Sequence, residues 1–244
     1  MRYFMSVDFI SDLHLDKSRP HVSDYFIAYI NNINNNTSDL FILGDLFEYW
    51  VGDDDPMEGL KEVKTSIKAL SKKINIWYMH GNRDFLVSKK ICDDLGMNNL
   101  TDPYMYEANK LKILLLHGDT LCTDDIDYQK FRSLVRSEVW QKEMLSKSLD
   151  ERLKIADELR KKSIAANSEK NEEIMDVNVN EIDKLISDYK PEVIIHGHTH
   201  RPNIHSHKIN NKQVTRYVLG DWYDKFFVLT LKNNKFSISK GKLK

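Results

Sequence analysis

The stretch LFILGD, residues 40–45, decides the fold of this chain, because four bulky apolar residues are followed at once by glycine and aspartate. Such a run is typical of a buried strand, and the polar pair marks where the strand leaves the core. Four other apolar runs end in the same way, and the five polar blocks are DLH (12–14), GD (44–45), GNRD (81–84), HGD (117–119) and GHTH (197–200). Since the carboxyl ends of the strands of an open α/β sheet face one crevice, we expect the five blocks to meet there.

Helical patterns lie between these apolar runs. Apolar residues recur at helical spacing over residues 22–33 and 60–70, and further helices are expected near 85–95 and 180–189. The expected strands are residues 3–10, 40–43, 74–79, 111–116 and 192–195, then short strands near 214–219, 226–231 and 236–239. Alternating strands and helices predict βαβ units, and the length suits a single domain, residues 1–244, with one insertion.

Residues 127–170 depart from this alternation. Their apolar residues recur at helical spacing without a strand between them, which predicts consecutive amphipathic helices inserted between two block-bearing strands. Residues 129–170 contain 11 Lys and Arg against 7 Asp and Glu, whereas the whole chain contains 36 against 37. We therefore expect anionic partners to meet this insertion, and the balanced overall charge argues against nucleic acid.

The sequence predicts neither secretion nor a membrane span. The N-terminal apolar run is short and contains Asp8, and no stretch approaches the roughly 20 apolar residues of a spanning helix. Cys92 and Cys122 fit no disulfide framework or metal spacing, so we expect structural thiols in a reducing cytosol.

The polar blocks contain the side chains of a two-metal centre. Asp12 and His14 can point to one side of an extended chain end, and the two oxygens of Asp45 can bridge two cations. The expected ligands are Asp12, His14, Asp45 and His200 for one cation, and Asp45, Asn82, His117 and His198 for the other. Imidazole and oxygen ligands without thiolate suit Mn, Fe or Zn. Two such ions, about 3.5–4 Å apart, can hold a hydroxide and neutralise a phosphoryl group under in-line attack.

Each block alone has a simpler explanation. Aspartate after a strand commonly caps a helix or closes a turn, and a lone histidine is commonly solvated or satisfied within the core. We interpret His21, His80, His196, His205 and His207 in that way. Five such blocks in one chain are not explained by capping alone.

In this order, D-x-H, G-D, G-N-x-D, H-G and G-H-T-H resemble the motifs of the calcineurin-like metallophosphoesterase superfamily, over residues 8–200. The resemblance implies an α/β sandwich of two β-sheets flanked by helices, with a dinuclear site at the strand ends and the two ligand sets given above. Arg83 departs from the wider superfamily, where a histidine often serves as general acid at this position. Arginine stays charged but can clamp phosphate oxygens, which favours a leaving group that needs no proton, such as half of a diphosphate.

Five longer strings resemble a narrower family, the UDP-2,3-diacylglucosamine pyrophosphohydrolases of lipid A biosynthesis. They are ILGDLFEYWVGDDDP (42–56), HGNRDFL (80–86), LLHGDTLCTDD (115–125), NSEKNEEIMDVN (167–178) and IHGHTHRP (195–202). The resemblance implies a Mn²⁺-dependent enzyme with two Mn²⁺ ions at the cytoplasmic face of the inner membrane of a Gram-negative bacterium. Its reaction cleaves UDP-2,3-diacylglucosamine to UMP and 2,3-diacylglucosamine 1-phosphate (lipid X), with metal-activated hydroxide attacking the uridine-side phosphorus.

The same resemblance implies the residues that meet the substrate. They are Asn82, Arg83, Asp125, Ser163, Asn167, Lys170 and His198, with Tyr128 and Arg160 as further candidates, and Asn82, Arg83 and His198 are the catalytic ones. Ser163, Asn167 and Lys170 share one face of a helix, a stripe that without the resemblance would be interpreted as solvated. Trp50, Phe85, Leu86 and apolar residues within 131–149 are expected to line an acyl-chain groove, with core packing as the alternative explanation.

An enzyme with a diacylated substrate must meet a membrane, and we expect peripheral attachment through the apolar and basic parts of the insertion. Two alternatives remain open from the sequence. One is a dinuclear phosphodiesterase that acts on soluble nucleotides. The other is a non-catalytic scaffold, which the full set of metal-ligating residue types disfavours.

Overall fold

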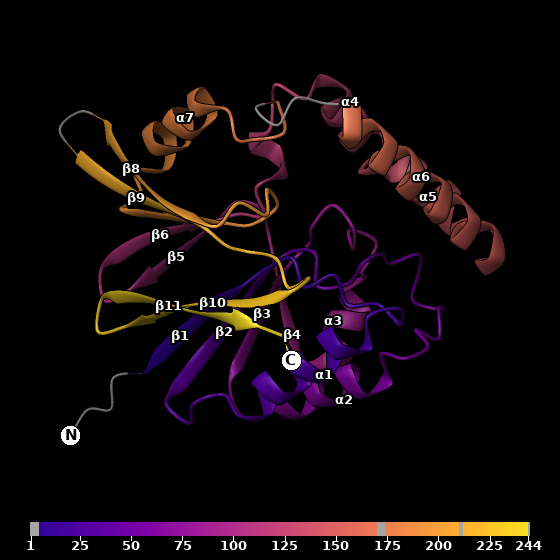
Figure 1. The fold of residues 1–244 in the computed structure, drawn as a ribbon, viewed down its shortest axis with the longest axis horizontal. Helices are drawn as coiled ribbons and strands as arrows, with labels where there is room; N and C mark the ends of the chain where they lie inside the picture. The colour runs from indigo at the N-terminus through magenta and orange to yellow at the C-terminus, as the bar shows by residue number, and fades with distance from the viewer. Residues whose placement is uncertain (1–4, 170–173, 210–211, 244) are drawn as a thin grey trace.

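Two β-sheets pack face to face in the computed structural model, which describes residues 5–169, 174–209 and 212–243 (Figure 1). The first sheet has the strand order β11 (Lys235–Lys242), β10 (Lys225–Lys232), β1 (Ser6–Ile10), β2 (Thr37–Leu43), β3 (Asn75–Met79) and β4 (Met97–Leu100). The second has the order β5 (Tyr104–Ala108), β6 (Leu111–Leu115), β7 (Val193–His196), β9 (Lys212–Val218) and β8 (Asn203–Ile209). The α/β sandwich predicted from the motifs is confirmed.

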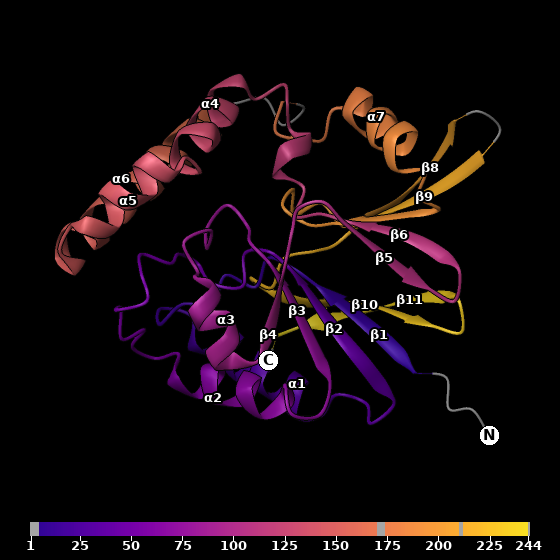
Figure 2. The same ribbon diagram turned by 180° about the vertical axis from the view of Figure 1, so that it is seen from behind.

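Helices cover the outer face of each sheet (Figures 1 and 2). Helices α1 (Pro20–Asn31), α2 (Lys61–Leu70) and α3 (Lys89–Leu95) lie on the first sheet, and α7 (Val179–Tyr189) lies on the second. Helix α3 is shorter than the expected helix over 85–95, because the Ser88 side chain caps it by accepting the N–H of Ile91 at 3.2 Å.

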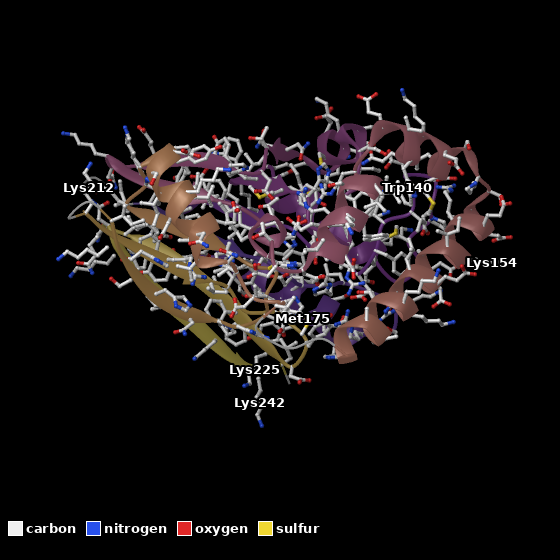
Figure 3. All side chains as sticks on the ribbon, turned by 90° about the horizontal axis from the view of Figure 1, so that it is seen from above. Trp140, Lys154, Met175, Lys212, Lys225 and Lys242 are labelled. Carbon is white, nitrogen blue, oxygen red and sulfur yellow. The ribbon has the colours of Figure 1, made fainter. Side chains whose placement is uncertain are left out.

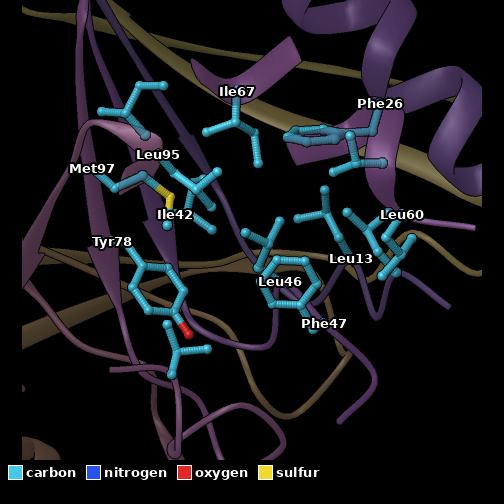
Figure 4. Packing of buried hydrophobic residues seen from close by; sticks show 14 of the residues in the cluster. Leu13, Phe26, Ile42, Leu46, Phe47, Leu60, Ile67, Tyr78, Leu95 and Met97 are labelled. Carbon is cyan, nitrogen blue, oxygen red and sulfur yellow. The ribbon is translucent and has the colours of Figure 1, made fainter. Parts of the chain in front are cut away.

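The apolar side chains of the strands alternate between two cores. In β2, Phe41 and Leu43 point between the sheets, where Phe41 stacks on Phe9 of β1 with ring centroids 5.2 Å apart. The intervening Leu40 and Ile42 point to the other face and pack against α1, α2 and α3. Figure 4 shows this second cluster. A strand with both faces buried has an apolar residue at every position, which is why the run from 40 to 43 was recognisable in the sequence.

Three strands were missed in the sequence: β4, β5 and β8. Each lies at the edge of its sheet, where one side of the strand has no neighbour and fewer side chains are buried. Strand β4, for example, buries Met97 and Leu100 but exposes the two asparagines between them. Such strands lack the continuous apolar run of the central strands.

Three consecutive helices precede α7 between β6 and β7, where residues 127–170 were predicted to be helical. They are α4 (Ile126–Val135), α5 (Glu138–Ser146) and α6 (Leu149–Glu169), and they extend beyond the two sheets (Figures 1 and 2). Figure 3 shows Trp140 and Lys154 of these helices at one end of the molecule and Lys212 of β9 at the other. The buried Arg152 fixes the start of α6, because its Nη1 donates to the Val51 carbonyl at 2.6 Å and to Asp54 Oδ1 at 2.8 Å.

Both cysteines are free and buried, as expected for structural thiols. Burial disfavours the thiolate and raises the pKa of Cys92 to about 11 and that of Cys122 to about 12.

We predict that the native protein reacts very slowly with a disulfide reagent at pH 8, whereas the unfolded chain, with its two cysteines, rapidly releases two equivalents of the reagent's thiolate. Rapid labelling of the native protein, followed by the absorbance of the released thiolate, would contradict this placement.

Candidate metal centre

The loops that carry the five polar blocks follow β1, β2, β3, β6 and β7. Within each sheet, backbone hydrogen bonds continue from the strands into these loops. The N–H of His14 donates to the Asp45 carbonyl at 2.9 Å, and the N–H of Gly197 donates to the His117 carbonyl at 2.8 Å. The loops of each sheet are therefore held in register, and their polar side chains meet as predicted.

Five of the predicted ligands have left-handed backbone conformations. The φ angles are 55° at Asp12, 51° at His14, 52° at Asp45, 68° at His198 and 54° at His200. Residues other than glycine rarely adopt these angles. Those that do are often found at functional sites. Here the unusual backbone turns each side chain away from the strand direction and toward the common centre.

Glycine is required in two of the loops because the backbone approaches an acidic side chain. A Cβ atom at Gly81 would lie 2.0 Å from Asp45 Oδ1 and 2.3 Å from the Asp45 nitrogen. A Cβ atom at Gly197 would lie 2.2 Å from Asp12 Oδ2. The glycines of the G-N-x-D and G-H-T-H blocks thus make room for the carboxylates of other blocks.

The first group of side chains lies around Asp12. His200 Nε2 lies 3.3 Å from Asp12 Oδ1 and 3.2 Å from His14 Nε2. The backbone N–H of His198 donates to Asp12 Oδ2 at 3.0 Å, which ties the second sheet to the first. His14 Nε2 also lies 3.8 Å from Asp45 Oδ2. The four side chains predicted for one cation are therefore brought together.

The second group also lies next to Asp45. His117 Nε2 lies 3.8 Å from Asp45 Oδ2 and 3.0 Å from Asn82 Oδ1. The same Asn82 oxygen lies 2.9 Å from His198 Nδ1. Asp45 Oδ1 accepts the backbone N–H of Arg83 at 2.8 Å, so that this carboxylate is fixed between the two groups.

This arrangement fits divalent cations. Carboxylate and imidazole atoms of Asp12, His14 and His200 lie within 4.8 Å of one another, as do those of Asp12, Asp45 and His117. Facing imidazole nitrogens beside carboxylate oxygens, without a thiolate, are ligands for a borderline transition metal. Asp12 and Asp45 are within reach of both groups, as a shared or bridging carboxylate must be.

The buried charges of the centre depend on one another. Burial alone would raise the pKa of Asp12, but hydrogen bonding to His200 and its charge hold that pKa below the usual range. Although burial lowers it, the charges of Asp45 and Asp119 raise the pKa of His117 to about 9. Burial and the neighbouring His117 lower the pKa of His198 to about 3. A cation held by His117 Nε2 would therefore displace a proton at neutral pH.

Three of the histidines have a partner at the ring nitrogen that faces away from the centre. His117 Nδ1 lies 2.9 Å from the Leu43 carbonyl, His14 Nδ1 lies 3.2 Å from Glu48 Oε2, and His200 Nδ1 lies 3.5 Å from Asp221 Oδ2. Glu48 and Asp221 were not recognised from the sequence. Glu48 is part of the quoted string over 42–56, whereas Asp221 follows β9 and belongs to no polar block.

Asp84 was also unassigned, although it ends the G-N-x-D block. Its buried carboxylate accepts the N–H groups of Leu46 and Gly81, both at 2.8 Å. This bridge connects the loop after β3 to the loop after β2. Asp84 therefore supports the position of Asn82 without facing the centre itself.

A groove of about 590 Å³ lies between the first-sheet loops and helices α4, α5 and α6. It reaches the metal centre at Asn82, which lines it together with Arg83. Its apolar lining comprises Trp50, Val51, Phe85, Leu86, Phe131, Val135, Trp140, Met144, Leu153 and Leu159. Trp50, Phe85 and Leu86 line the groove as expected, together with part of the 131–149 segment. The apolar residues Leu134, Val139 and Leu145 of that segment, by contrast, are exposed and do not line it.

The structure places some of the predicted substrate residues in the groove and others outside it. Arg83, Tyr128, Arg160 and Ser163 line the groove, and the Tyr128 ring lies 5.7 Å from the His198 ring. Asp125 is buried at the start of α4, where its Oδ1 accepts the Tyr128 N–H at 3.1 Å. Lys170 and the side chain of Asn167 lie outside the described residues.

Helix α4 is held over the centre by buried charge. Asp119 Oδ2 accepts hydrogen bonds from Arg132 Nε at 2.7 Å and from the Tyr128 hydroxyl at 3.0 Å. Arg136 adds a hydrogen bond to the Gly81 carbonyl at 2.8 Å. Arg132 of α4 and Arg136, which directly follows this helix, thus connect the second-sheet and first-sheet loops.

The order and placement of these motifs match a known family. A family model described as calcineurin-like phosphoesterase covers residues 5–202. The chain belongs to this family. Membership of the calcineurin-like phosphoesterases implies divalent metal ions, and the residues gathered here offer suitable ligands.

Several relatives of this calcineurin-like phosphoesterase are similar over nearly its whole length. A protein of Aliivibrio fischeri named UDP-2,3-diacylglucosamine hydrolase is 39% identical and covers 98% of this chain and 100% of its own. Proteins of the same name from Stenotrophomonas maltophilia and Serratia proteamaculans are 40% and 41% identical, covering 96% and 90% of this chain and 98% and 92% of theirs. The narrower family resemblance in the sequence is thereby confirmed.

Among solved structures, a protein titled a novel archaeal phosphodiesterase superposes with a TM-score of 0.50. It covers 98% of this chain and 99% of its own at 15% identity, a likeness of fold alone. None of the helices in the described part of the calcineurin-like phosphoesterase has the length and apolar character needed to cross a bilayer.

We predict that Gly81→Ala abolishes tight binding of divalent cations, although it removes no ligand. The added methyl group would displace the Asp45 carboxylate, because the new carbon would lie 2.0 Å from Asp45 Oδ1. Titration calorimetry with Mn²⁺ measures the effect. Gly220→Ala is the matched control, because the three atoms nearest to its new Cβ belong to the Phe227 side chain, at 3.1 Å or more. This variant should bind the metal as the unchanged protein does.

Proposed function

We propose that this calcineurin-like phosphoesterase hydrolyses the diphosphate bond of UDP-2,3-diacylglucosamine in lipid A biosynthesis, releasing UMP and 2,3-diacylglucosamine 1-phosphate. The groove of about 590 Å³ carries the proposal, since it joins the metal centre at Asn82 to apolar walls. A substrate with a diphosphate and two acyl chains needs these two surfaces side by side. The relatives named UDP-2,3-diacylglucosamine hydrolase support the same substrate.

The proposed cofactor is a pair of Mn²⁺ ions. Asp12, His14, Asp45 and His200 would hold one, and Asp45, Asn82, His117 and His198 the other, as their placement around Asp45 suggests. When bound, such cations polarise a phosphoryl oxygen and lower the pKa of water to near neutrality. Mixed nitrogen and oxygen ligands suit Mn²⁺ but do not select it from other transition metals.

The reaction breaks the bond between the uridine-side phosphorus and the bridging oxygen, and water supplies the new oxygen of UMP. We assign Asn82, Arg83 and His198 to the reacting diphosphate. Arg83 lines the groove, and its permanently charged guanidinium can hold two phosphate oxygens as charge develops. The bridging oxygen leaves as part of a phosphate monoester, which does not require a proton from the protein.

The remaining substrate contacts lie along α4 and α6. Tyr128, Arg160 and Ser163 line the groove, and the last two can donate hydrogen bonds to the nucleotide and phosphates. Asp125 caps the start of α4, and its contact with the substrate stays a prediction from the sequence. Asn167 and Lys170 stay predictions from the sequence, in which their spacing from Ser163 is that of one helical face.

UMP release from UDP-2,3-diacylglucosamine in detergent is expected in the presence of Mn²⁺ and should stop when a chelator is added. Asp45→Ala should reduce the rate by at least a thousandfold, because it removes the carboxylate common to both ligand groups. The comparison substrate is a UDP-sugar without acyl chains. Equal rates on both substrates would favour a phosphodiesterase of soluble nucleotides, and no UMP from either would end the proposal.

We also propose a single domain, 1–244, in which residues 127–170 form a lid that meets the cytoplasmic face of the inner membrane. Helices α4 and α5 expose large apolar side chains, with exposed fractions of 62% at Ile126, 56% at Leu134 and 78% at Val139. Exposed apolar side chains and nearby lysines together favour a peripheral position on anionic lipid.

Replacing Leu134 and Val139 together by Asp should reduce sedimentation with anionic vesicles severalfold, since it removes apolar area and adds negative charge. Ile204→Asp is the control, because Ile204 of β8 is similarly exposed at 52% but lies on a different part of the molecule. If both variants bind vesicles like the unchanged protein, α4 and α5 are not the membrane contact.

A further inference from the structure

Glu48, on the loop after β2, has a buried carboxylate with three partners. Its Oε2 atom accepts a hydrogen bond from Arg19 Nη2 at 2.9 Å and lies 3.2 Å from His14 Nδ1. Its Oε1 atom lies 3.2 Å from Arg160 Nη2 of α6. Only 3% of the Glu48 side chain is exposed. One carboxylate therefore contacts both a residue of the metal centre and a residue of the helical segment.

The His14 ring has little freedom to choose another partner. Its Nε2 atom faces His200 Nε2 at 3.2 Å. Its Nδ1 atom makes no hydrogen bond within the described residues, and the Glu48 carboxylate oxygen lies 3.2 Å from it. The ring stacks on Tyr223 with centroids 5.2 Å apart and planes inclined by 8°. The Arg19 guanidinium in turn lies 4.4 Å from the centroid of the Tyr223 ring. The His14 ring is thus held with Nδ1 toward Glu48.

We propose that Glu48 is a positioning residue that fixes the orientation and tautomer of His14 and couples Arg160 of the helical segment to the metal centre. A carboxylate near Nδ1 keeps the ring proton on that atom, so that Nε2 is free to bind a cation and becomes more basic. This inference rests on the metal site of the proposed function. Glu48 itself contacts no cation in this scheme.

The ion pair between Glu48 and Arg160 is not needed to hold α6 in place. The start of α6 is already anchored by Arg152, which is 3% exposed and bonds to the Val51 carbonyl and to Asp54. Arg160, by contrast, is 42% exposed and lines the groove. Arg160 and His14 share the Glu48 carboxylate. An anionic group that binds Arg160 therefore weakens the ion pair between Arg160 and Glu48, and the negative charge of Glu48 then acts more strongly on His14. Occupation of the groove and cation affinity are then linked in both directions.

The test is a Mn²⁺ titration of the metal-free protein, followed by calorimetry and by electron paramagnetic resonance. In Glu48→Gln, we expect the affinity of one cation to fall about tenfold or more while the other is unchanged. At Mn²⁺ concentrations that give a coupled two-ion spectrum in the unchanged protein, this variant should show isolated ions. Glu138→Gln is the matched control, because Glu138 is 89% exposed on α5 and pairs only with Lys142 among the described ion pairs.

Arg160→Gln provides the second test, at a position whose exposure makes misfolding a minor concern. It keeps the Glu48 carboxylate and removes a competing cation, so the affinity for the same Mn²⁺ should stay equal or increase. An unchanged isotherm in Glu48→Gln, or an equal loss of affinity in both variants, would overturn the positioning role and leave a purely structural ion pair. If the unchanged protein binds no Mn²⁺, the metal centre of the proposed function fails instead.

Discussion

The buried carboxylate of Asp45 connects the two sheets and the metal centre, and the positions of the surrounding groups depend on it. One oxygen accepts the Arg83 N–H, and the other lies 3.8 Å from a histidine of each sheet. A buried carboxylate is tolerated only with such partners, because removing charge from water is costly unless it is compensated. The glycine at position 81 and the left-handed backbone at Asp45 itself follow from the same requirement.

The sequence predicts the parts of the molecule that depend on local pattern. The central strands have both faces buried and end in glycine and polar residues, so the strands and the blocks after them were recognisable together. The edge strands β4, β5 and β8 bury fewer side chains and give no comparable signal. The positions of the polar blocks also predicted which side chains gather at the metal centre, because each block follows the end of one strand.

Residues that act through tertiary contacts were not predictable in this way. Glu48 and Asp221 are next to histidines only because of how distant loops pack, and no spacing in the chain relates them. The apolar residues that α4, α5 and α6 contribute to the groove were recognisable as helical faces. An apolar helical face can, however, either line a groove or pack into a core. Only the position of α4, α5 and α6 beyond the sheets distinguishes the two cases. The position of α4 in turn relies on the buried contact between Asp119 and Arg132.

The order of the blocks along the chain also affects how the molecule is made. His14 and His200 face each other at 3.2 Å but are separated by 186 residues, and the first sheet is completed beside β1 only by β10 and β11. A ribosome must therefore synthesise most of the chain before the proposed centre has its full set of ligands. Loading of metal would follow translation instead of guiding it, and an incomplete nascent chain would offer no finished site to compete for the cell's free cations.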